Sequence, residues 1–199
     1  MREGEPVVVV SGLPRSGTSM VMQMLSAGGL TCATDGLRAA DEDNPRGYFE
    51  VERVKGLHKA GDKSWMREYQ GRVIKVISFL LRHLPGELRY RVLLIHRDLE
   101  EVLASQRRML LRRREDPDAV PEPEMARAFA DHLREVEAFL EEAPNFEVLQ
   151  LDYGRVLADP AAVARAIDGF LGGGLDRGAM AAAVDGSLHR NRRQEGEEA

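Results

Sequence analysis

The chain has 199 residues, of which 43% are hydrophobic and 31% charged, which fits one globular domain and excludes a disordered or collagen-like chain. The formal net charge of −5 argues against general nucleic-acid binding, and a single cysteine, Cys32, excludes an intrachain disulfide and a cysteine-based metal site. No apolar run reaches the roughly 18 residues of a membrane span. We expect one domain at residues 1–193, a disordered tail at 194–199, and a soluble cytoplasmic protein without a membrane partner.

The first half of the chain alternates strands with helices, which predicts a parallel sheet covered on both faces. Residues 7–11 form a β-branched run typical of a buried strand, and apolar residues recur at helical spacing from 18 onward. In chain order we predict a strand at 7–11, a helix at 18–27, a short strand near 30–33, a loop at 34–50, a helix at 51–60, a strand at 72–77, a short helix at 79–83 and a strand at 91–96.

The second half continues the same alternation. We predict a helix at 99–113, a linker at 117–123, a long helix at 125–142, a strand at 146–151, a helix at 160–171 and a last helix at 176–184. Asp159 and Pro160 are typical of a helix cap and first helical residue, and glycines at 172–174 end that helix. The fold class is therefore α/β, a single domain with a central parallel sheet flanked by helices.

The strongest chemical signal is the turn between the first strand and the first helix. Gly12 and Gly17 lie five residues apart, and backbone N–H groups at a helix N-terminus can converge on a phosphate-like anion. This predicts a P-loop. A Walker loop has lysine where this chain has Thr18, so the main cation of ATP hydrolysis is missing. Arg15 is the positive charge inside the loop.

The sequence Leu-Pro-Arg-Ser-Gly-Thr-Ser at 13–19 resembles the 5′-phosphosulfate loop of sulfotransferases that use 3′-phosphoadenosine 5′-phosphosulfate (PAPS). The resemblance implies that Arg15 stabilises the bridging oxygen during transfer. A second segment, residues 92–105, resembles the family's 3′-phosphate segment, which implies that Arg97 and Ser105 hold that phosphate. It also implies a fold like that of P-loop nucleoside kinases and sulfotransferases. The donor-binding residues implied by this resemblance are Pro14, Arg15, Ser16, Gly17, Thr18, Ser19, Arg97, Ser105 and, in a basic tail that folds over the nucleotide in relatives, Arg190.

Weaker similarities extend along most of the chain. Residues 44–50 resemble a loop of bacterial members, and residues 151–160 and 170–172 are similar to the family's late strand and helix. Gly154 replaces the usual glutamate there, and Met20 stands where cytosolic members often have tryptophan. The adenine-stacking residue is therefore open, with Trp65 and Phe79 as candidates.

Transfer also needs a base for the acceptor's proton. Lys75 is placed like the lysine that relatives direct at the transferring group, but the position of the catalytic histidine is Ile77. Relatives acting on sugars or tyrosine use a carboxylate shortly after the first helix, which implies Asp35, followed by Glu50 and then Asp41. His58 and His96 are further candidates without supporting features.

Two basic clusters stand out in this acidic chain, which suggests small-anion sites, although arginines on helix faces can equally be solvated and paired with acids. The clusters are Arg107, Arg108, Arg112, Arg113 and Arg114, and Arg190, Arg192 and Arg193.

The resemblance implies transfer of a sulfuryl group from PAPS to a hydroxyl or amine of a small-molecule, carbohydrate or peptide acceptor, with no required metal. One alternative is a nucleotide-dependent kinase in which Arg15 replaces the lysine and Asp98 or Asp41 holds magnesium. Another is a non-catalytic nucleotide-binding module. The acceptor and the oligomeric state stay open.

Overall fold

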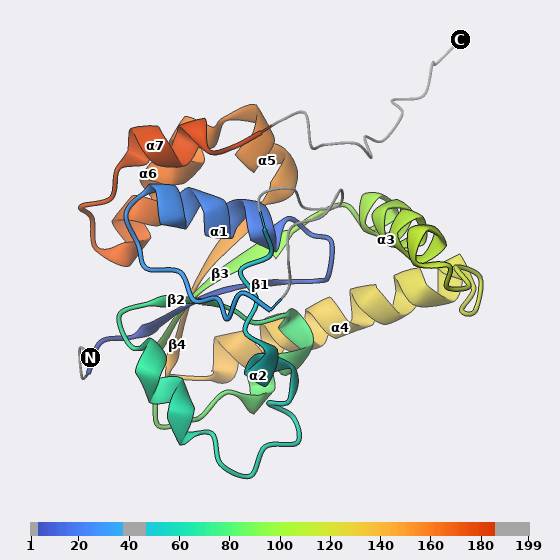
Figure 1. The fold of residues 1–199 in the computed structure, drawn as a ribbon, viewed down its shortest axis with the longest axis horizontal. Helices are drawn as coiled ribbons and strands as arrows, with labels where there is room; N and C mark the ends of the chain where they lie inside the picture. The colour runs from blue at the N-terminus through green and yellow to red at the C-terminus, as the bar shows by residue number, and fades with distance from the viewer. Residues whose placement is uncertain (1–3, 38–46, 186–199) are drawn as a thin grey trace.

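The computed structural model describes residues 4–37 and 47–185. One sheet of four parallel strands runs through the molecule in the order β2-β1-β3-β4, with helices on both faces (Figure 1). The strands are β1 (Val7–Gly12), β2 (Val73–Lys75), β3 (Tyr90–His96) and β4 (Phe146–Asp152). The predicted α/β fold class is confirmed.

The central position of β1 follows from its sequence. All six of its residues are buried, and it pairs with β2 on one side and with β3 on the other. A strand covered on both faces is apolar along its length rather than alternating, as the valine run at 7–10 is. The carboxyl end of β1 therefore lies between the ends of its neighbouring strands, and open α/β sheets bind ligands at the carboxyl ends of their strands.

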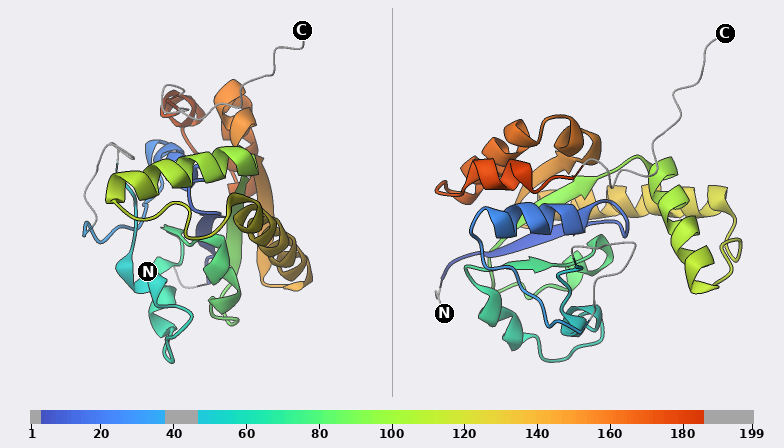
Figure 2. Two further views of the ribbon diagram at one scale, coloured as in Figure 1. Left: turned by 90° about the vertical axis from the view of Figure 1, so that its right-hand side faces the viewer. Right: turned by 45° about the horizontal axis from the view of Figure 1, so that its top comes forward.

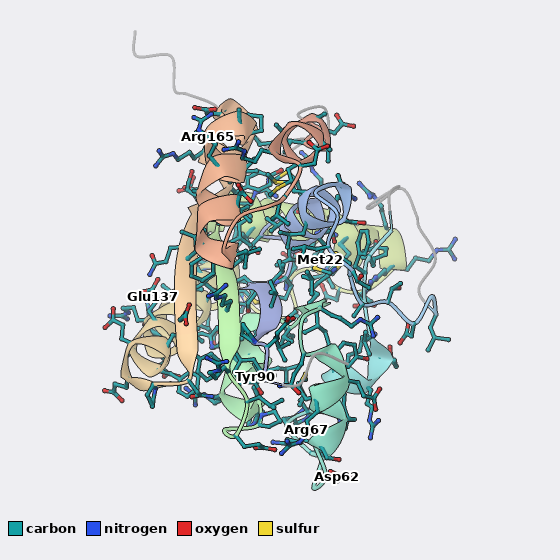
Figure 3. All side chains as sticks on the ribbon, turned by 90° about the vertical axis from the view of Figure 1, so that its left-hand side faces the viewer. Met22, Asp62, Arg67, Tyr90, Glu137 and Arg165 are labelled. Carbon is teal, nitrogen blue, oxygen red and sulfur yellow. The ribbon has the colours of Figure 1, made fainter. Side chains whose placement is uncertain are left out.

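Two helical layers cover the sheet. One face carries α1 (Thr18–Ala27), α5 (Tyr153–Ala158), α6 (Pro160–Leu171) and α7 (Arg177–Ala182). The other carries α2 (Glu52–Lys55), α4 (Glu122–Glu142) and the 3₁₀ helices η1 (Ser64–Tyr69) and η2 (Ser78–His83). Met22 and Tyr90 mark the two cores, and Figure 3 shows them in separate layers.

A helical hairpin stands at the carboxyl-end side of the sheet. Helix α3 (Leu99–Arg113) packs against α4, and the two are joined at their far end (Figures 1 and 2). Leu13 of the loop after β1 packs in a small core with Val102, Leu103 and Phe129 of these helices. The hairpin is thereby fixed to the predicted phosphate loop.

Most predicted elements are confirmed, and the helices at 18–27, 99–113 and 160–171 have the predicted bounds. The helix predicted at 51–60 is wrong beyond Lys55, because the chain turns at Gly56. Near 30–33 there is a single bridge, between Cys32 and Val73. The helices η1 and α5 were not predicted, and the predicted tail at 194–199 lies outside the described residues.

Candidate active site

A cavity of about 590 Å³ lies at the carboxyl ends of β1, β2 and β3. Its walls come from the loop before α1, from α2, from the end of β2 and from one face of α3. Most of the predicted site residues meet here although they are far apart in sequence. Those that line the cavity are Pro14, Arg15, Gly17, Thr18, Ser19, Glu50, Lys75, Arg97 and Ser105.

The two loop glycines are required by geometry. A Cβ on Gly12 would lie 2.6 Å from the backbone oxygen of Ile95. Gly17 has a φ of 104°, which L side chains rarely adopt, and a Cβ there would lie 2.5 Å from the ring of Tyr153. These glycines let the loop pass closely over β3 and α5 before the chain enters α1.

The start of α1 is suited to an anion. A helix leaves its first N–H groups without intrahelical acceptors. No described side chain caps α1, and Gly17, Thr18 and Ser19 at its start line the cavity. An oxyanion in the cavity would meet these groups and the positive end of the helix dipole.

Arg15 connects the loop to α3. Its backbone has a φ of 72°, in the left-handed region that non-glycine residues rarely occupy. Its Nε donates a hydrogen bond to Oγ of Ser105 at 3.0 Å, and its carbonyl accepts one from Nη1 of Arg97 at 3.1 Å. The predicted 5′ and 3′ phosphate residues therefore form one network.

Arg97 is held from three sides. Its Nε donates to Glu101 at 2.8 Å, and its guanidinium lies 4.2 Å from the ring centroid of Tyr153. The side chain is 7% exposed. Burial raises the pKa of Tyr153, so its phenol stays protonated beside the cation at neutral pH. The guanidinium is thus fixed in place at the cavity wall.

A second polar chain lies at the end of β2. Nζ of the buried Lys75 donates to Oγ of Ser19 at 3.1 Å and lies 4.0 Å from Oε1 of Glu50. Glu50 is mostly buried, with 21% of its side chain exposed. A carboxylate, an ammonium group and the first turn of α1 therefore adjoin within the cavity.

Asp35 is placed differently from Glu50, although its backbone N–H donates to the Glu50 carbonyl at 3.1 Å. Asp35 does not line the cavity. Its carboxylate accepts hydrogen bonds from the backbone N–H groups of Glu52 and Leu37, and these bonds lower its pKa. This exposed carboxylate ties the residue 35–37 turn to the start of α2.

Several other candidates lie away from the cavity. Ser16 is buried beneath the loop near Gly12, and its N–H donates to the Leu13 carbonyl. Trp65 packs in the core, and Phe79 stacks on His132. Neither of these aromatic side chains lines the cavity. The candidates that lie outside the described residues are Asp41 and the second basic cluster, Arg190, Arg192 and Arg193.

The two histidine candidates are separated, since His58 lines the cavity and His96 lines a second hollow beside β4. Asp98, a magnesium ligand in the kinase alternative, caps α3 by accepting from the N–H groups of Glu100 and Glu101. It does not line the cavity.

Tyr48, Lys55 and Met109 line the cavity and were not singled out from the sequence. Three arginines of the basic cluster on α3, Arg108, Arg112 and Arg113, also line it. The arginines were visible as a basic cluster, but which of them face the cavity depends on how α3 packs.

Within residues 4–37 and 47–185, no group of three or more His, Cys, Asp and Glu side chains could hold a metal ion. No helix in the same ranges is both long enough and apolar enough to cross a bilayer.

This chain is similar to known proteins in sequence and in fold. Residues 5–195 match the model of a family described as the sulfotransferase domain. The sulfotransferase domain from the Synechococcus PCC 7002 olefin synthase is 17% identical with a TM-score of 0.52, covering 96% of this chain and 82% of that chain. Mouse sulfotransferase SULT7A1 complexed with PAP is 17% identical with a TM-score of 0.53, covering 94% and 64%. Sulfotransferase STF9 from Mycobacterium avium is 15% identical with a TM-score of 0.51, covering 90% and 67%. A search of curated proteins found no match.

Proposed function

Since this chain belongs to the sulfotransferase domain family, we propose that it transfers a sulfuryl group from PAPS to a hydroxyl or amine of a small acceptor. The observation that carries the proposal is the joining of Arg15, Arg97 and Ser105 in one hydrogen-bonded network on one cavity. Two arginines on one cavity suit a nucleotide that carries two separate anionic groups. PAP is adenosine 3′,5′-bisphosphate, the part of PAPS that remains after the sulfuryl group has left. The complex of the mouse relative with PAP supports the same donor class.

The residues present fit this donor. The uncapped start of α1 and Arg15 suit the phosphosulfate, while Arg97 and Ser105 suit the 3′-phosphate. Gly17, Thr18 and Ser19 supply backbone and hydroxyl donors, and Pro14 shapes the loop beside them. Ser16 contributes through the fold of the loop, and Arg190 stays a proposed contact of the basic tail.

The donor supplies a sulfuryl group joined to its 5′-phosphate through a bridging oxygen. Arg15 places positive charge where negative charge develops on the departing phosphate. Lys75, held by Ser19, places a second cation beside the transferring group. Positioning and charge stabilisation of this kind require no metal ligand from the chain.

Glu50 is the proposed base. It lines the cavity, whereas Asp35 does not, and its carboxylate lies beside Lys75 near the start of α1. It would accept the proton of the acceptor group as the new bond from oxygen or nitrogen to sulfur forms and the bond from sulfur to the bridging oxygen breaks. Asp35 keeps a structural contact in this account, and His58 is the second candidate base.

The test is transfer of label from sulfur-35 PAPS to a panel of alcohols, phenols and amines in the presence of EDTA. Labelled product formed without metal is the expected result, and Arg15→Ala should lower turnover more than PAP affinity. ATP-dependent phosphorylation that requires magnesium would favour the kinase alternative. A tight PAP complex without turnover on any acceptor would favour a non-catalytic module.

A further inference from the structure

The charge of the cavity is opposite to that of the chain. Among the described residues, seven cationic and two acidic side chains line it, although the whole chain has a net charge of −5. The acidic side chains are Glu50 and Asp185, and the cationic ones are Arg15, Lys55, Lys75, Arg97, Arg108, Arg112 and Arg113. Cations gathered at a cavity raise the local concentration of anionic ligands.

Three of these cations are assigned to the donor by the proposed function, on which this inference rests. They are Arg15, Arg97 and Lys75. Lys55 is offset by acids of its own, since its Nζ lies 2.6 Å from Glu52 and 3.7 Å from Glu50. The other cationic side chains of the lining are the three arginines on α3, which the proposed function does not assign to the donor.

These arginines share one face of α3, which we call the arginine face and define as Arg108, Arg112 and Arg113. Spacings of three, seven and eight residues from Ser105 place them along the side of the helix that Ser105 presents to the cavity. At 1.5 Å per residue, Arg112 lies about 10 Å farther along the helix axis than Ser105. The arginine face therefore extends beyond the proposed 3′-phosphate contact.

The arginines of α3 do not all lie on the side of the helix that lines the cavity. Arg107 does not line the cavity and forms an exposed ion pair with Asp118. Arg112 and Arg113 lie in the last turn of α3, where the negative end of the helix dipole stabilises any cation. Arg108 precedes the last turn and lines the same cavity.

An apolar wall adjoins the arginine face. Val54, Ile77, Leu80 and Met109 line the cavity together with Glu50 and Lys75. A ligand held here would meet a carboxylate and an ammonium group, an apolar surface and a row of guanidinium groups. Guanidinium groups bind carboxylates and phosphates through paired hydrogen bonds.

We propose that the acceptor is a small hydroxyl compound with an apolar body and an oxyanion group, and that the arginine face binds the oxyanion. Its hydroxyl then lies toward Glu50 and Lys75, and its body lies against the apolar wall. The chemistry of the oxyanion can be that of a carboxylate or a phosphate.

The test uses four phenols with similar bodies: 3-(4-hydroxyphenyl)propanoate, (4-hydroxybenzyl)phosphonate, 3-(4-hydroxyphenyl)propanamide and tyramine. Calorimetry measures their binding to the PAP complex, and label transfer from PAPS measures kcat/KM. We expect both anionic probes to have an affinity and a kcat/KM at least tenfold higher than those of the amide, and tyramine to have the lowest values. A stronger response to the phosphonate identifies a phosphate-type acceptor, and a stronger response to the propanoate identifies a carboxylate type.

The variant is Arg112→Gln combined with Arg113→Gln, and Arg107→Gln on the same helix is its matched control. The double variant should lower the affinity of the anionic probes at least tenfold, leave the amide unchanged and keep PAP affinity within twofold. The control should match the wild type in all three.

Two results overturn the inference while leaving the proposed function intact. One is equal or absent binding of all four probes by a protein that binds PAP, and the other is loss of PAP affinity in the double variant. Failure of the wild type to bind PAP would instead contradict the proposed function.

Discussion

Arg15 donates a hydrogen bond from Nε to Oγ of Ser105, 90 residues farther along the chain, at 3.0 Å. The contact joins the loop after β1 to the face of α3, and Arg97 reinforces it by donating to the Arg15 carbonyl. A non-glycine residue in the left-handed region costs on the order of 1–3 kcal/mol, so this conformation needs support from its surroundings. The two predicted phosphate contacts are therefore structurally coupled.

Gly17→Ala should destabilise the fold and impair the loop. The residue has a φ of 104°, and an added Cβ would lie 2.5 Å from Tyr153. We expect a loss of more than about 1 kcal/mol in the free energy of unfolding and a loss of PAP binding, measured by urea denaturation and calorimetry. Gly86→Ala, where a Cβ would have no neighbour within 4 Å, is the control. Equal stability of the two variants would contradict this description of the loop.

Arg97→Ala should remove the preference for adenosine 3′,5′-bisphosphate over AMP. A buried charge-assisted contact of this kind contributes about 2 to 4 kcal/mol, or roughly 30- to 800-fold in affinity. Calorimetry with both nucleotides measures the preference, and a thermal melt shows whether the variant is folded. An unchanged preference in a folded Arg97→Ala protein would move the 3′-phosphate to another residue.

Glu50→Gln and Asp35→Asn distinguish the two carboxylates. Glu50→Gln removes the proposed general base and should lower kcat by about 100-fold or more, while its PAP affinity should stay within twofold of the wild type. Asp35→Asn should keep kcat within tenfold, because its carboxylate bonds to backbone N–H groups and does not line the cavity. Steady-state kinetics of label transfer provide the measurement. An inactive Asp35→Asn with an active Glu50→Gln would restore Asp35 as the base.

His132 should make the stability depend on pH. Its ring stacks on Phe79 with centroids 3.7 Å apart, and burial lowers its pKa from the ordinary 6.5. Below 6.5 the unfolded chain takes up the proton first, so the contribution of neutral His132 is present above that pH and decreases as the pH falls toward the folded pKa. Urea denaturation at pH 7.5 and 5.5 should show a smaller difference for His132→Gln than for the wild type. An equal difference in both proteins would exclude this histidine as the cause.

The fold could be predicted well where structure is set locally. The valine run, the loop glycines and Asp159 before Pro160 each specify an element through their own conformational preferences. The helix beyond Lys55 was wrong because Gly56 starts a turn that the apolar pattern did not reveal. Helix α5 is one short segment capped by Asp152, too brief for a periodic signal.

The site was predictable only in part, for a similar reason. Motifs identified the loop, Arg97 and Ser105, because each motif is a short stretch of sequence at or just after the end of one strand. The choice between Asp35 and Glu50 depends on the course of a non-helical segment. A backbone hydrogen bond joins the two residues, but of the two only Glu50 lines the cavity. The direction of each α3 arginine likewise depends on the packing of α3 against α4.

The most direct test of the account is the binding of adenosine 3′,5′-bisphosphate and AMP to the wild-type protein by calorimetry. Because Arg97 and Ser105 line the same cavity as the loop at the start of α1, we predict that the bisphosphate binds at least about 30-fold more tightly, a difference of about 2 kcal/mol. Equal affinities for the two nucleotides would contradict it.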